Sequence, residues 1–114
     1  MSKNRVVWLV LIALLALTVA LPVAANSSAL KKVRVYDYSY SPRTTYAVLG
    51  DTIGWKNFGP TVHTVTSSDG LFDSSIMSLN ELYSWTPTAA GTYNYYCTLH
   101  AGQTGRIIVS SAGQ

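Results

Sequence analysis

The chain has 114 residues, with eight basic and five acidic side chains and a formal net charge of +3. This length predicts one domain with a single small core. The weak charge gives no indication of a nucleic-acid partner. The chain contains only one cysteine, so it cannot form an internal disulfide bond.

The first 25 residues have the layout of a secretory signal peptide. The basic segment "MSKNR" is followed by the apolar run 6–21 and by the small residues of "PVAA". We predict a signal peptide over 1–25, cleaved after Ala25, and one domain over 26–114. An uncleaved membrane anchor is the alternative, although the apolar run is short for a span of about 20 residues. The protein is therefore expected in the periplasm or outside the cell, and at a membrane only if this segment remains attached.

Strand-like patterns follow one another along the rest of the chain. In 31–40, Val33 and Val35 alternate with polar residues, and in 92–97 Tyr93, Tyr95 and Cys97 share one face. Further strands are predicted over 44–49, 52–58, 62–67, 82–87 and 105–110, and a loop with a short helical turn over 71–81. Short strands at this spacing are typical of an antiparallel β-sandwich or barrel.

The segment "CTLHAGQTG" contains the chain's single cysteine and one of its two histidines. Cys97 and His100 are three residues apart at the end of a predicted strand, and His63 lies in another strand. Taken singly, each would more often be an ordinary core residue. Together, a thiolate, two imidazoles and a weak axial ligand from the same loop suit a blue-copper site, and Gln103 lies in that loop, three residues after His100.

Two longer segments resemble cupredoxins of the plastocyanin and amicyanin type. "GDTIGWKNFGPTVHTV" is similar to the region around the first histidine ligand, and "AGTYNYYCTLHAGQTGRIIV" is similar to the ligand loop and last strand. The resemblance implies an all-β, Greek-key antiparallel β-sandwich. It also implies that His63, Cys97 and His100 are copper ligands.

Gln103 departs from this pattern, because it stands where these cupredoxins carry an axial methionine. Plant stellacyanins use glutamine there, but they also carry a disulfide that this chain cannot form. An amide oxygen is a harder ligand than a thioether sulfur, so it favours Cu(II) over Cu(I). We therefore expect a lower reduction potential than in methionine homologues, and zinc is expected as an adventitious metal.

Other residues near the ligands have candidate roles. Residues that could orient the ligands are Val62, Thr64 and Thr98. The resemblance further implies that redox partner proteins dock on an apolar surface around His100. The candidates for that surface are Leu99, Ala101 and Gly102.

The function predicted from these residues is one-electron transfer by a monomeric type 1 copper protein outside the cytoplasm. The alternative is copper buffering or delivery without electron transfer. An enzyme is not expected, because a hydrolytic Cys-His pair would need an orienting acid that the sequence does not indicate. A third reading is an interaction module that has lost its metal, but all three strong ligands are present.

Overall fold

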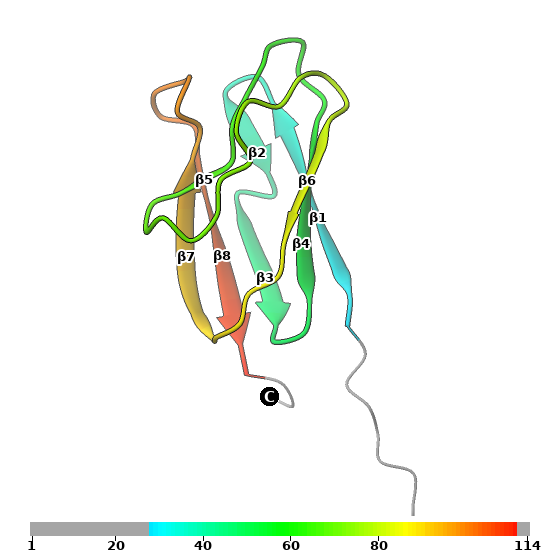
Figure 1. Ribbon diagram of the computed structural model, residues 1–114, viewed down its shortest axis with the longest axis vertical. Coiled ribbons are helices and arrows are strands. Elements are labelled where there is room, and N and C mark those ends of the chain that lie inside the picture. The colour runs from blue at the N-terminus through cyan, green and yellow to red at the C-terminus, as the bar shows by residue number, and fades with distance from the viewer. Residues whose placement is uncertain (1–27, 112–114) are drawn as a thin grey trace, which may run out of the picture.

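The structure, a computed structural model, describes residues 28–111 as two four-stranded β-sheets that pack on each other (Figure 1). One sheet has the order β2-β1-β4-β6 and the other the order β3-β8-β7-β5. The strands are β1 (Leu30–Tyr36), β2 (Ser39–Ser41), β3 (Thr44–Val48), β4 (Thr52–Asn57), β5 (Thr66–Ser67), β6 (Leu82–Trp85), β7 (Gly91–Tyr96) and β8 (Thr104–Ser110). The predicted sandwich is confirmed.

The strands were predicted to pair antiparallel throughout. Each observed sheet instead contains both parallel and antiparallel pairs, and neither sheet closes into a barrel. β1 runs parallel to β4, with Val33 opposite Trp55, and β3 runs parallel to β8, with Thr45 opposite Ile107. The reason is that the chain changes sheet between β2 and β3 and again between β3 and β4. After these two crossings β4 returns beside β1 in the same direction, so the two strands pair in parallel.

The core lies between the sheets and follows the alternation of the strands. Val33, Val35 and Trp55 point inward from one sheet, and Tyr95 and Ile107 point inward from the other. The rings of Trp55 and Tyr95 meet edge to face, with their centroids 5.4 Å apart. The inward faces predicted from period-two patterns in 31–40 and 92–97 are therefore confirmed.

The segment around His63 is less regular than predicted. Of the expected strand 62–67, only Thr66–Ser67 is a strand, and His63 pairs with Met77 in an isolated antiparallel bridge. The bridge is made by the backbone groups of these two residues, at 2.8 and 3.2 Å. No residue of the loop 71–81 is helical, so the short helical turn predicted there is wrong; residues 79–80 form a non-helical turn, with Asn80 at a φ of +69°.

The predicted signal peptide, 1–25, lies outside the described residues. Within 28–111, no helix is long and apolar enough to cross a membrane.

Candidate metal centre

Three predicted ligands meet at one end of the sandwich. Cys97 follows β7, His100 lies in the loop between β7 and β8, and His63 lies between β4 and β5. The Cys97 Sγ is 3.5 Å from the Nδ1 of His100 and 3.9 Å from the Nδ1 of His63, and the two Nδ1 atoms are 3.1 Å apart. Both imidazoles therefore turn the same nitrogen toward one thiol. A thiol and two imidazoles converging in this way are a donor set that copper or zinc accepts.

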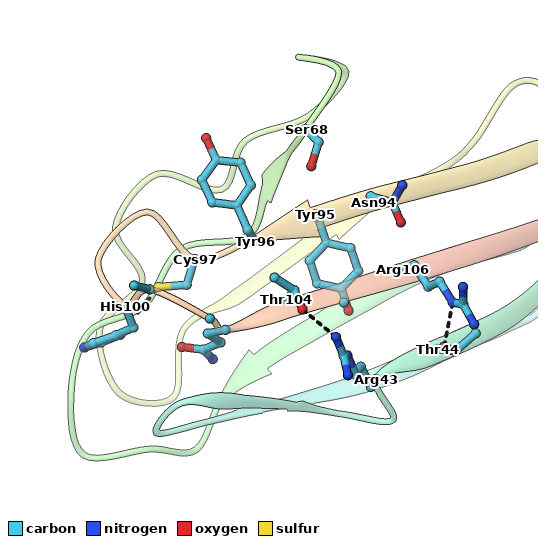
Figure 2. A pocket seen from close by; sticks show the side chains of 14 residues that line it. Arg43, Thr44, Ser68, Asn94, Tyr95, Tyr96, Cys97, His100, Thr104 and Arg106 are labelled. Atoms are coloured by element: carbon cyan, nitrogen blue, oxygen red, sulfur yellow. Dashed lines mark hydrogen bonds between the residues drawn. The ribbon is translucent and has the colours of Figure 1, made fainter.

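The loop that carries Cys97 and His100 is closed by its own backbone. The N–H of Cys97 donates to the carbonyl of Gln103 at 3.0 Å, and the N–H of Gln103 donates to the carbonyl of His100 at 3.2 Å. Gly102 has a φ of +85°, which a residue without a Cβ adopts readily. Figure 2 shows Cys97 and His100 at one end of a shallow pocket, away from Arg43 and Arg106.

His63 is fixed by a buried asparagine at the end of β4. The side-chain Nδ2 of Asn57 donates to the carbonyls of Thr61 and Met77, both at 3.0 Å, and its Oδ1 accepts from the N–H of Gly59. Asn57 thus ties together the chain before His63 and the segment that pairs with it. His63 itself is fully buried.

Gln103 is buried, and its two polar atoms have different surroundings. The Nε2 donates to the carbonyls of Tyr36 and Ser39, both at 3.1 Å. These two acceptors identify which end of the amide is nitrogen. The Oε1 is buried and has no hydrogen-bond partner among the described residues. A buried acceptor without a partner costs about 1–3 kcal/mol, so this oxygen fits the role of a metal ligand.

Thr64 joins the two segments that carry the ligands. Its N–H donates to the Cys97 Sγ at 3.4 Å, and its Oγ1 accepts from the N–H of Thr98 at 2.9 Å. An N–H directed at the sulfur stabilises a thiolate and orients it. Val62, the third residue expected near the ligands, has a side chain that is 41% exposed.

Two residues at this site had not been predicted from the sequence. The Oδ1 of Asp37 is 2.9 Å from the Nε2 of His63, and it also accepts from the hydroxyl of Thr61 at 2.7 Å. The Thr61 hydroxyl, followed by His63, lowers the pKa of the Asp37 carboxyl below its ordinary value. Thr61 lies close to His63 in sequence, but Asp37 lies 26 residues before it, and no local pattern indicates their contact.

The predicted docking residues lie at the surface of the same end. His100 is partly exposed, Leu99 is 44% exposed, and Ala101 and Gly102 are exposed. Tyr38, which the sequence did not single out, places its ring edge-on to His100 with centroids 5.1 Å apart. Exposed apolar atoms therefore surround the histidine that reaches the surface.

The turn between β1 and β2, residues 36–39, contacts three of the four candidate ligands. Asp37 contacts one histidine, Tyr38 contacts the other, and the carbonyls on either side accept from Gln103. This turn belongs to one sheet, whereas the Cys97 loop joins two strands of the other. The site is therefore built across both layers of the sandwich.

The sequence pattern of the cupredoxin-like domain family matches residues 7–109. This chain is a cupredoxin. Amicyanin of Paracoccus denitrificans is 30% identical over 82 residues, which make up 68% of this chain and 63% of the relative. Amicyanin of Paracoccus versutus is 32% identical over 65 residues, or 53% of this chain and 49% of the relative. The cupredoxin thus spans about half to three fifths of the relatives it matches.

Solved structures agree with this assignment. A purple cupredoxin from Nitrosopumilus maritimus is 24% identical and superposes with a TM-score of 0.66, covering 70% of this chain and 99% of that chain. At this identity the likeness supports the fold alone. A methionine-to-glutamine mutant of amicyanin in the Cu(I) state is 30% identical, with a TM-score of 0.66 over 71% and 82% of the two chains. The resemblance to cupredoxins expected from the sequence is confirmed.

Proposed function

We propose that this cupredoxin binds one copper ion through His63, Cys97 and His100, with Gln103 as axial ligand, and transfers single electrons. The observation that carries the proposal is the convergence of the three strong ligands. The Sγ and the two imidazole nitrogens lie within 4.8 Å of one another. The amicyanin relatives include a structure described as the Cu(I) state, which supports copper as the metal.

A bound copper ion supplies the Cu(II)/Cu(I) couple, and the protein keeps its ligands in place for both states. His63 and Cys97 are buried and hydrogen-bonded, and the loop that carries His100 is closed by backbone bonds. Side chains held in this way move little when the charge at the site changes. Small movement favours electron transfer over the exchange of copper with a delivery partner.

We place the protein outside the cytoplasm and give His100 the role of electron exit. The signal-like segment 1–25 supports export, and the matches to amicyanins are consistent with it. His100 is the partly exposed ligand, and Leu99 and Tyr38 add apolar surface beside it. A redox partner that covers this surface would approach the copper through one imidazole.

The proposal is tested by titrating the protein from residue 26 onward with Cu(II) and recording visible absorption and EPR spectra. An intense thiolate–copper band with narrow copper hyperfine splitting is expected, and Cys97→Ser should abolish the band. Weak spectra without that band, with Cys97 still open to thiol reagents, would contradict the proposal. Rapid loss of copper to a chelator together with slow electron self-exchange would favour the buffering or delivery alternative instead.

A further inference from the structure

We propose that Asp37 is a positioning residue of the metal centre, whose carboxylate holds the Nε2–H of His63 and favours the oxidised state of the bound copper. The part that concerns copper rests on the proposed function. The hydrogen bond itself concerns only residues of this chain.

The hydrogen bond fixes the tautomer of His63. A carboxylate can only accept, so an Nε2 that is 2.9 Å from the Asp37 Oδ1 must carry the proton. In the neutral imidazole the Nδ1 then keeps its lone pair, and this is the atom that faces Cys97 and His100. The contact therefore presents a ready metal ligand and prevents the buried ring from turning.

The surroundings of Asp37 are built for this contact. The Thr61 hydroxyl donates to the same Oδ1 at 2.7 Å, and the Thr61 N–H approaches it at 3.3 Å. At Gly59, a Cβ would lie 2.5 Å from the Asp37 Oδ1 and 3.2 Å from the His63 Nε2. A side chain at this position would thus separate the two groups, and glycine allows them to meet.

Asp37 and His63 also form the sole contact within 4 Å between a carboxylate and a basic side chain among residues 28–111. None of the Lys and Arg residues within 28–111 lies within 4 Å of a carboxylate oxygen. The Asp37–His63 contact therefore does not belong to a network of surface ion pairs. The Asp37 side chain is 26% exposed, whereas His63 is buried. One negative charge therefore acts on the inner histidine ligand from a position that water only partly screens.

The negative charge of Asp37 is expected to shift the Cu(II)/Cu(I) equilibrium toward Cu(II). A carboxylate that accepts the Nε2–H makes the imidazole a stronger donor and adds negative charge near the metal. Both effects stabilise Cu(II) more than Cu(I), because Cu(II) carries the higher charge. Asp37 should therefore lower the reduction potential, independently of Gln103.

The variant that tests this is Asp37→Asn, which keeps the size and an acceptor oxygen but removes the charge. The ratio of Cu(II) to Cu(I) affinity should fall about tenfold, if the loss of about tenfold in metal affinity that removal of such a group causes falls on Cu(II). Tenfold corresponds to a rise of about 59 mV for one electron. The matched control is Asp69→Asn, which removes the same charge from an exposed turn residue whose side chain accepts no hydrogen bond within the described part of the chain.

The second measurement is ¹⁵N NMR of His63 in the metal-free wild-type protein, where a slowly exchanging Nε2–H is expected. A proton on Nδ1 instead, or equal potential shifts in the Asp37 and Asp69 variants, would overturn the inference. If Asp37→Asn does not fold, the NMR spectrum of the wild-type protein shows which nitrogen of His63 carries the proton, and a proton on Nδ1 overturns the inference. Absence of the thiolate–copper band in the wild-type protein would overturn the proposed function and this inference together, whereas a normal band with equal shifts overturns only the inference.

Discussion

Gln103 combines two roles in one side chain. Its amide nitrogen donates to the carbonyls of Tyr36 and Ser39, and its oxygen is buried without a partner among residues 28–111. A methionine could replace the oxygen as an axial ligand, but it could not donate to the two carbonyls. The glutamine is therefore expected to affect both the copper couple and the stability of the turn at 36–39.

We predict that Gln103→Met raises the reduction potential by about 60 mV or more, which is at least a tenfold change in the relative affinity for the two oxidation states. The reason is that a thioether favours Cu(I) more than an amide oxygen does. The free energy of unfolding should also fall by about 1–3 kcal/mol, because two hydrogen bonds to the carbonyls of Tyr36 and Ser39 are lost, each contributing about 0.5–1.5 kcal/mol. Spectroelectrochemistry and urea unfolding measure the two effects, and an unchanged or lower potential would contradict the axial role.

The residues of the site differ in how far the sequence could predict them. Cys97 and His100 share one short loop, so their spacing made them candidates for one metal, although such a pair also occurs by chance. His63 could be added because it was the remaining histidine. Asp37 reaches His63 only because the turn after β1 folds over the end of β4, and this contact depends on the pairing of distant strands. A periodic pattern carries no information about such a contact.

Among the elements, the segment around His63 depends on the ligand loop for its position. Residues 62–65 belong to no strand, and Thr64 is the point at which they meet the loop after β7. The Thr64 Oγ1 accepts from the N–H of Thr98 at 2.9 Å and lies 3.3 Å from its hydroxyl. Thr64 also accepts from the Tyr40 hydroxyl through its backbone carbonyl. One residue thus connects the two ligand-bearing segments and the core.

We predict that Thr64→Val lowers the free energy of unfolding by about 1–2 kcal/mol, because the N–H of Thr98 loses its acceptor. The variant should also release copper faster to a chelator, since the loop that carries Cys97 and His100 is held less firmly. Thr92→Val, on the exposed face of β7, is the matched control and should change stability by less than about 0.5 kcal/mol. Equal effects of the two substitutions would show that Thr64 does not act as this connection.

The individual strands show where prediction from alternating residues succeeds and where it fails. Alternation grouped the buried residues of β1 and β7 on one face, because each of these strands has one face toward the core. It failed at 62–65, where residues 63–65 are buried without a regular ladder and His63 is paired by a single bridge. It also missed the parallel pairs, because they depend on where the chain changes sheet.

At the scale of the whole molecule, the candidate metal site and the turn between β3 and β4, which carries the buried Asp51, lie at opposite ends of the sandwich (Figure 1). Asp37 follows the last residue of β1, whereas Ala29 precedes its first residue. The N–H of Ala29 donates to the Asp51 Oδ1 at 2.9 Å, and the N–H of Val48 donates to the Oδ2 at 3.0 Å. Asp51 thus fastens the start of β1 to the turn between β3 and β4.

These two N–H donors hold the pKa of Asp51 below its ordinary value, the Val48 bond having the larger effect. A lowered folded-state pKa means that the ionised carboxylate stabilises the fold above the unfolded-state pKa of about 3.9. This stabilisation is lost as the pH falls through the lowered pKa of the folded protein. Stability of the wild-type protein should therefore decline below about pH 4.

We predict that Asp51→Asn lowers the free energy of unfolding near neutral pH by about 1–3 kcal/mol, because an amide offers one acceptor oxygen to two N–H groups. The variant should lose less additional stability than the wild type below about pH 4, since it no longer carries this carboxylate. Its reduction potential should remain that of the wild type, because the substitution lies at the end of the sandwich away from the ligands. Urea unfolding across this pH range and spectroelectrochemistry provide the measurements. An equally acid-sensitive variant would contradict the role of Asp51, and a shifted potential would mean that the two ends of the sandwich are coupled through β1.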